Sequence, residues 1–273
     1  MSRLSVTDVR NALKCPRFFV LCKKYGKPSR VFSGHFVGSM VHVTMQKSLK
    51  ELSNPMIFSR AFKDSVHSKE LVEKVIENFL YKHFYAVVES RLDKMEEISQ
   101  IHRAWRLVRL AKSRIADLIV KTAAITSLEA VPGRLILGVE KPFKIKIEVG
   151  GCEVTLSGRI DAALRDPENG EVLLWDFKTG RGKNMRLDAA QLALYSYAVE
   201  ELWRETPRAK LLYFSEEGLR RVEVSKDPER GSEIFKYILR MVKWLRGEEA
   251  PPRADLEVCV YCHLKSSCDE VFQ

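Results

Sequence analysis

Residues 158–180 read GRIDAALRDPENGEVLLWDFKTG, and this stretch indicates the architecture of the chain around it. A polar segment, DPENG, separates an alternating run from an apolar one, which predicts a strand, a turn and a second strand. Asp161 should then lie at the end of the first strand and Asp176 near the end of the second. Because side chains alternate across a strand, Asp176 and Lys178 should point to one face and Phe177 to the other.

Two acids and a lysine placed in this way favour a metal site. An acid followed two residues later by a lysine is common on exposed strands, where it is a surface ion pair. Asp176, however, follows four apolar residues, and burying a charge without a partner is costly. With Asp161 at a second strand end, the pattern suits Mg²⁺ or Mn²⁺, and Lys178 could orient or activate a water molecule.

Length and composition indicate a soluble globular protein with a sizeable core. The chain has 273 residues, of which 45% are hydrophobic and 30% are charged. It has no apolar run long enough to cross a membrane and no secretory signal, so we expect a cytoplasmic protein without a membrane partner. The 46 Lys and Arg exceed the 36 Asp and Glu by ten, which favours a polyanionic partner such as DNA, although a generally basic surface would give the same charge.

The cysteines gather near the two ends of the chain. Cys259 and Cys262 form a C-x2-C pair, Cys268 follows closely, and Cys15 precedes Pro16 near the N-terminus. Disulfides are not expected inside a cell, so this clustering points to a metal centre that joins the two ends.

Zinc and an iron–sulfur cluster both accept four thiolates. The uneven arrangement of one cysteine plus three favours the cluster over a zinc site, which usually pairs two C-x2-C units. Cys22 and His263 are alternative ligands. Four cysteines without any metal remain the simplest alternative.

Periodicity along the chain predicts one α/β core that carries a helical insertion at 55–130, and not two independent domains. Gln191 and Tyr195 are four residues apart on an expected helix, so they share one face, although Tyr195 could simply pack in the core. The basic faces of the insertion could be solvated or could follow DNA. We expect helices over 5–14, 36–52, 68–90, 93–126, 186–204 and 229–246, and strands over 134–140, 143–149, 152–160, 171–177, 208–215 and 219–224.

In order along the chain, Gly38-x-x-x-His42, Gly-Arg-Ile-Asp161, Asp176-Phe-Lys178 and Gln191-x-x-x-Tyr195 resemble the RecB-type branch of the PD-(D/E)XK nuclease superfamily. The four cysteines resemble the iron–sulfur subset of that branch, which includes the nuclease domain of AddB and the CRISPR-associated Cas-four exonucleases. The resemblance implies one nuclease domain over 1–273, with a mixed central sheet flanked by helices. Segments 1–25 and 255–273 would together form the iron–sulfur region.

The resemblance also implies the role of each residue. Lys178 would position or deprotonate the attacking water, and Gln191 and Tyr195 would hold the scissile strand. A structural 4Fe-4S cluster and Mg²⁺ or Mn²⁺ would be the cofactors. The metal ligands would be His42, Asp161, Asp176 and the backbone carbonyl of Phe177, and the cluster ligands would be Cys15, Cys259, Cys262 and Cys268.

We therefore expect a metal-dependent deoxyribonuclease that acts on single-stranded DNA or DNA ends, in CRISPR adaptation or in DNA repair. The chain has no phosphate-binding loop, so a helicase or a CRISPR integrase would be a separate partner, and a homo-oligomer is an open alternative. The other hypotheses are a DNA-end-binding and assembly module with little catalysis, and a redox-sensing iron–sulfur protein. Asp176 departs from the Cas-four pattern, which often has Glu at this position, and the insertion is long for that subgroup.

Overall fold

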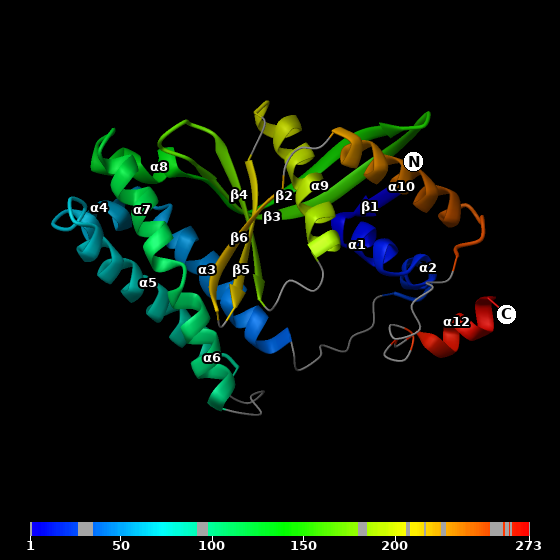
Figure 1. Ribbon diagram of the computed structural model, residues 1–273, viewed down its shortest axis with the longest axis horizontal. Coiled ribbons are helices and arrows are strands. Elements are labelled where there is room, and N and C mark those ends of the chain that lie inside the picture. Colours follow the sequence, from blue (N-terminus) through cyan, green and yellow to red (C-terminus); the bar gives the residue numbers. More distant parts are fainter. Residues whose placement is uncertain are drawn as a thin grey trace.

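The centre of the fold is a six-stranded mixed sheet, seen here in a computed structural model (Figure 1). The structure describes residues 2–26, 35–91, 98–179, 185–205, 208–215, 217–224, 228–251, 259, 262 and 264–272. The strand order is β1-β3-β4-β5-β6, and β2 pairs with β3. The strands are β1 (Ser2–Ser5), β2 (Ile136–Val149), β3 (Cys152–Arg165), β4 (Val172–Thr179), β5 (Arg208–Ser215) and β6 (Gly218–Val224).

Strand β3 connects the two halves of the sheet. The antiparallel partner β2 follows β3 along its whole length, so β1 and β4 must share the opposite edge. Strand β1 pairs in parallel with residues 154–157, whereas β4 pairs antiparallel with residues 162–165. Residues 158–161 therefore lie where the sheet opens between β1 and β4, and this opening contains Asp161.

Two hydrophobic cores cover the two faces of the sheet. Strand alternation separates the side chains of β4: Leu173, Trp175 and Phe177 enter the first core, and Val172 and Leu174 enter the second. The first core is completed by α3 (His35–Leu52), α4 (Pro55–Phe62), α5 (Lys69–Glu89), α6 (Ile98–Arg109), α7 (Lys112–Ala123) and α8 (Val131–Leu135). The second is completed by α1 (Val6–Lys14), α2 (Pro16–Tyr25), α9 (Met185–Trp203) and α10 (Pro228–Leu245).

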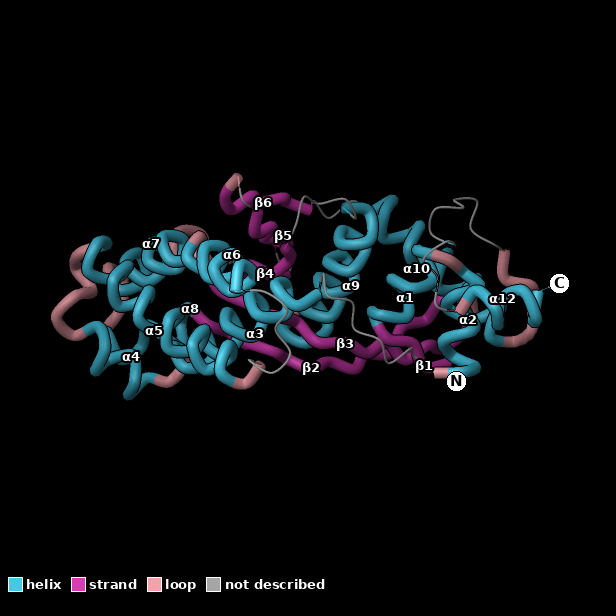
Figure 2. The backbone as a smooth tube through the Cα atoms, turned by 90° about the horizontal axis from the view of Figure 1, so that it is seen from below, coloured by secondary structure: helices cyan, strands magenta, loops and turns pink. Residues whose placement is uncertain are grey.

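The molecule is elongated, and the long β2–β3 hairpin runs along it between the two groups of helices (Figure 2). Helices α4 to α7, which cover the expected insertion at 55–130, lie with α8 at one end, and α1, α2 and α10 lie at the other (Figure 1). The expected hairpin between β3 and β4 is confirmed, because Arg165 pairs with Val172 across the predicted turn.

The N-terminal and C-terminal segments pack together. Helix α12 (Lys265–Phe272) contacts α2, and α10 also contacts α2. The Tyr237 hydroxyl donates to the Ala12 carbonyl at 2.6 Å, and Arg17 Nε donates to the Ala250 carbonyl at 3.1 Å. The two ends of the chain are therefore joined by ordinary hydrogen bonds, whatever the cysteines bind.

Three expectations for the insertion and the sheet were wrong. The helix expected over 93–126 is two helices, α6 and α7, separated by a tight turn at Leu110 and Ala111. The strands expected over 134–140 and 143–149 are one strand, β2, in which Pro142 is tolerated because β2 is an edge strand. Asp161 lies inside β3, which continues to Arg165, and not at a strand end.

The elements that were not anticipated include β1, α2, α4, α8 and α12. Strand β1 precedes the first helix, which Ser5 caps: the Ser5 hydroxyl accepts from the Asp8 backbone N–H. Helix α4 begins at Pro55, which suits the first position of a helix, and Asn54 caps it. The segment around Pro55 was expected only to break the chain between helices.

Candidate active site

Asp176 is the most deeply buried group of the site. Strand alternation directs it to the same side of β4 as Leu174, toward α9, and its exposed fraction is 0%. Burial raises the pKa of Asp176 to about 7; the charge of Asp161 adds to this effect, whereas the charge of Lys178 opposes it. Oxygen Oδ2 of the Asp176 carboxylate lies 2.8 Å from Lys178 Nζ, and the two groups form an ion pair. This contact lacks the angles of a hydrogen bond, and no other described residue donates one to Oδ2.

Lys178, Gln191 and Tyr195 form a hydrogen-bonded chain with Asp176. Lys178 Nζ donates to Asp176 Oδ1 at 2.9 Å, and Gln191 Nε2 lies 3.1 Å from the same oxygen. Gln191 and the Tyr195 hydroxyl are 2.7 Å apart on one face of α9, as their spacing predicted. Burial, with the nearby acids, raises the pKa of the Tyr195 phenol, so this hydroxyl stays protonated and can donate a hydrogen bond.

His42 and Asp161 meet from different elements. His42 lies on α3, Asp161 lies on β3, and His42 Nε2 is 2.8 Å from Asp161 Oδ2. Burial works against the charge of His42, but the hydrogen bond and the negative charge of Asp161 outweigh it, and the pKa of His42 is raised. Burial likewise opposes ionisation of Asp161, yet the contacts with His42 and Lys178 lower its pKa. The Phe177 backbone N–H donates to Asp161 Oδ2 at 3.1 Å and ties β4 to this acid.

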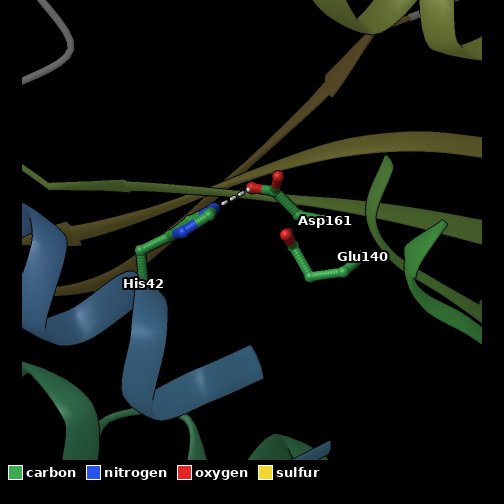
Figure 3. A group of neighbouring side chains, drawn as sticks. All are labelled: His42, Glu140 and Asp161. Atoms are coloured by element: carbon green, nitrogen blue, oxygen red, sulfur yellow. Dashed lines mark ion pairs between the residues drawn. The ribbon is translucent and has the colours of Figure 1, made fainter. Parts of the chain in front are cut away.

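Glu140 is a site residue that sequence reasoning missed. Ligand atoms of His42, Glu140 and Asp161 all lie within 4.8 Å of one another, and the three side chains converge in Figure 3. Glu140 accepts hydrogen bonds from Gln46 and from Arg159, the latter at 2.7 Å. Its φ of 53° is a left-handed conformation in the middle of a strand, which costs a non-glycine residue about 1–3 kcal/mol. Its place opposite Asp161 depends on the pairing of β2 with β3, which the sequence does not reveal.

Two glycines of the motifs permit close approach around the site. A Cβ at Gly38 would lie 2.7 Å from the Thr179 hydroxyl, so α3 can pack against the end of β4 only with glycine there. A Cβ at Gly158 would lie 2.6 Å from the Phe143 ring, which packs edge-on against Tyr195 at 6.0 Å between centroids. These glycines set how His42 and Tyr195 approach the sheet.

The donor set fits a hard divalent cation. Carboxylate oxygens with one imidazole are suitable ligands for Mg²⁺ or Mn²⁺. The buried Oδ2 of Asp176 makes an ion pair with Lys178 but accepts no hydrogen bond of good geometry from the described residues. The buried carboxylates of Asp161 and Asp176 also repel each other. Burial and this repulsion both raise the pKa of Asp176. A divalent cation would relieve both costs. His42, Glu140, Asp161 and Asp176 are the side chains that could hold it.

The cysteines lie at the packed ends of the chain. Cys15 separates α1 from α2, and Cys268 lies on α12, the helix that contacts α2. Cys259 and Cys262 are joined by a backbone hydrogen bond of 3.1 Å, and the described cysteines form no disulfide. Cys22 is buried in α2. His263, the other alternative ligand, lies outside the described residues, as do residues 255–258 of the expected cluster region.

Comparison with known proteins agrees with this fold. The PD-(D/E)XK nuclease superfamily profile matches residues 3–269. The chain therefore belongs to the PD-(D/E)XK nuclease superfamily, and the expected fold class, an α/β core with a mixed sheet flanked by helices, is confirmed.

Solved structures resemble the chain over nearly all of its length. A provisionally named exonuclease from Eubacterium rectale is 12% identical with a TM-score of 0.51, over 97% of this chain and 88% of that one. The protein SSO0001 is 16% identical with a TM-score of 0.46, over 100% of this chain and 88% of that one. At these identities the likeness concerns the fold alone. No curated protein matches the sequence.

Among the described residues, no helix combines the length and the apolar character that a membrane crossing requires.

Proposed function

We propose that this protein is a metal-dependent deoxyribonuclease that hydrolyses phosphodiester bonds. The observation that carries the proposal is the convergence of His42, Asp161 and Asp176 beside the ammonium group of Lys178, from α3, β3 and β4. A divalent cation bound there would supply Lewis acidity and lower the pKa of a water molecule. Its ligands would be His42, Asp161, Asp176 and the backbone carbonyl of Phe177, with Glu140 as a further carboxylate.

The remaining residues have distinct tasks in this proposal. Lys178 orients the attacking water or takes its proton, and it stabilises the negative charge that develops on the phosphate. Gln191 orients Lys178 and Asp176, since it lies within 3.4 Å of the Lys178 ammonium and 3.1 Å of the acid. Tyr195 keeps its proton and can donate it in a hydrogen bond to the strand that is cut.

We propose single-stranded DNA or DNA ends as the substrate class. The net charge of +10 favours a polyanion, and aromatic side chains can stack on unpaired bases. On the insertion, Tyr81 and Tyr85 are 55% and 53% exposed, and Tyr81 packs edge-on against Trp105 of α6. The exonuclease name of one structural neighbour agrees with action at ends. CRISPR adaptation and DNA repair are the two settings that we propose, with an integrase or a helicase as partner.

We also propose a structural 4Fe-4S cluster bound by Cys15, Cys259, Cys262 and Cys268. Support comes from the packing of α12 against α2, which brings the segments of Cys268 and Cys15 to the same end of the molecule. The cluster would add a covalent link to the hydrogen bonds that already join the two ends.

The alternative function is a DNA-end-binding and assembly module with little catalysis. Such a module would bind DNA equally well in the presence of a chelator and in the presence of a divalent metal ion. The complete chain of contacts from Asp176 through Gln191 to Tyr195 favours catalysis, because simple binding does not require a buried acid with a raised pKa.

The test uses end-labelled single-stranded DNA with Mn²⁺, and compares Asp176→Asn with Asp166→Asn. Asp166 is a matched control, because it is also buried but lies in the β3–β4 turn, where it accepts from the Glu168 backbone. We expect cleavage by the wild type and by Asp166→Asn, its loss in chelator, and a decrease of at least about 100-fold in Asp176→Asn. Equal cleavage by both variants would reject the proposed site.

A further inference from the structure

Arg10 lies beside the proposed active site but belongs to none of the motifs of the chain. It is on α1, which packs against α9, the helix that carries Gln191 and Tyr195. Its Nη2 atom is 2.8 Å from Oδ1 of Asp188, in the first turn of α9. Asp188 is 3% exposed, so this ion pair connects segments 178 residues apart through a buried carboxylate.

Asp188 lies on the same face of α9 as Gln191 and Tyr195. Residues 188, 191 and 195 follow the i, i+3, i+7 spacing, which places them on one side of a helix. Arg10 therefore lies at the end of a row that continues through Gln191 and Tyr195. Burial and the two acids raise the pKa of Tyr195, and the positive charge of Arg10 acts in the opposite direction.

The Arg10 guanidinium has N–H donors that its ion pair with Asp188 does not use. An arginine carries five N–H donors in a planar fork, and a single carboxylate oxygen leaves most of them unused. Nε of Arg10 is buried and has no hydrogen-bond partner among the described residues. The side chain is 27% exposed, so part of the group can still be reached from outside. A ligand that reaches the exposed part of the guanidinium would find N–H donors that the Asp188 oxygen leaves unused.

We infer that Arg10 binds a phosphate of the DNA strand beside the catalytic centre, and that Asp188 holds its guanidinium in place. We place this phosphate next to the one that is cut, because Arg10 contacts Asp188, three residues before Gln191 on α9, and it is Gln191 that contacts Lys178. A guanidinium suits this task because it binds phosphate oxygens through two parallel N–H groups. The inference rests on the proposed function for the identity of the ligand, DNA.

The Arg10–Asp188 ion pair has a second interpretation, which the test must distinguish from phosphate binding. Arg10 and Asp188 could serve only to fasten α1 to α9. Loss of either residue would then have the same effect on the protein, whereas only loss of Arg10 removes a phosphate contact. The salt dependence of DNA binding distinguishes these readings, since each phosphate neutralised on a single strand contributes about 0.7 to the slope of log K against log [salt].

The experiment measures binding of a fluorescent single-stranded oligonucleotide in Ca²⁺, at several salt concentrations, with intact DNA verified on a gel. Arg10→Ala, Arg10→Lys and Asp188→Asn are compared with Arg165→Ala. Arg165 is a matched control, because it is 33% exposed and pairs with Glu205 through two bonds of 2.9 Å, outside the proposed site. Melting temperatures are recorded for all variants.

We expect Arg10→Ala to weaken binding about tenfold and to reduce the salt slope by about 0.7. Arg10→Lys should keep the slope, since it keeps the charge, and Asp188→Asn and Arg165→Ala should also keep it. An unchanged slope in Arg10→Ala, or an equal decrease in Arg10→Ala and Asp188→Asn, would overturn the inference. Because the measurement needs no cleavage, it distinguishes failure of this inference from failure of the nuclease proposal, which cleavage in Mn²⁺ reports separately.

Discussion

At the scale of single residues, Asp176 makes stability depend on pH. Its pKa of about 7 is raised from an ordinary value of 3.8, so the folded protein holds this proton more tightly than the unfolded chain does. The stability that this provides is complete below about pH 4 and is lost as the pH rises through about 7. Each pKa unit corresponds to about 1.4 kcal/mol, so the loss amounts to a few kcal/mol.

We therefore expect the wild-type protein in chelator to lose more stability between pH 5 and pH 8 than Asp176→Asn does. The asparagine cannot ionise, so this part of the pH dependence disappears. Thermal unfolding over that pH range measures the difference. Parallel curves for the two proteins would mean that Asp176 has an ordinary pKa.

Glu140 should contribute to metal affinity, although no motif contains it. Its carboxylate lies with His42 and Asp161, and its left-handed backbone is a cost that some function must justify. We expect Glu140→Gln to weaken Mn²⁺ binding by about 10-fold to 100-fold, as loss of supporting groups around a metal usually does. Calorimetric titration with Mn²⁺ measures this, and Glu148→Gln, an exposed acid of the same strand, is the control. Equal affinities would remove Glu140 from the metal site.

The residues of the site were predicted where the signal is local. Asp176 and Lys178 are two apart on a strand, and Gln191 and Tyr195 are four apart on a helix, so each pair could be placed without knowledge of the fold. Glu140 and Arg10 could not. The role of Glu140 depends on a backbone angle, and that of Arg10 depends on a partner 178 residues away. Neither role produces a pattern among the residues that are adjacent in the sequence.

At the scale of elements, Gly38 determines how closely α3 approaches β4. A Cβ there would lie 2.7 Å from the Thr179 hydroxyl, so in Gly38→Ala something must shift, and we expect α3 to move away and displace His42, one turn further along. We expect a loss of about 1–3 kcal/mol in stability and weaker Mn²⁺ binding, as overpacking usually costs this much. Chemical denaturation and metal titration measure the two effects.

The cause can be checked by a second change. Thr179→Ala removes the hydroxyl that the new methyl group meets, so the double variant should recover most of both losses. Gly133→Ala is the control, because a Cβ at Gly133 meets no atom within 4 Å. If the double variant is no better than Gly38→Ala, contact with Thr179 is not the reason that glycine is needed.

Regular elements were predicted well where periodicity is strong. The expected helix over 186–204 is α9, and the expected strand over 208–215 is β5. The turn between α6 and α7 was missed, because Leu110 and Ala111 are good helix formers. Tertiary contacts determine the turn, because α6 packs against α3 whereas α7 packs against α5. Strand β1 was missed because its pairing partner is about 150 residues further along the chain.

At the scale of the whole molecule, the proposed cluster links the two ends of the chain. We expect Cys259→Ser to lose iron and the absorbance near 400 nm, and to melt several degrees lower, because the link closes a very long loop. Cys152→Ser is the control, since Cys152 begins β3 and is not one of the four proposed ligands. Iron analysis and thermal unfolding measure both. A colourless wild-type protein without iron, purified anaerobically, would contradict the cluster.

The arrangement of the two cores explains why the proposed catalytic residues come from so many segments. The insertion packs on one face of the sheet and carries no site residue, while α3, at its border, supplies His42. The opposite face supplies Gln191 and Tyr195 through α9. The opening of the sheet between β1 and β4 is the place where these parts meet, beside Asp161. The motifs indicated which residues belong together, and the register of β3 shows where they converge.

Lys178→Ala tests the central claim most directly, because it separates metal binding from catalysis. The account predicts that this variant binds Mn²⁺ at least as tightly as the wild type, since a competing positive charge beside Asp176 is gone. It also predicts that cleavage of end-labelled single-stranded DNA falls by at least about 100-fold at saturating Mn²⁺. Cleavage at the wild-type rate by a folded, metal-loaded Lys178→Ala protein would contradict the account.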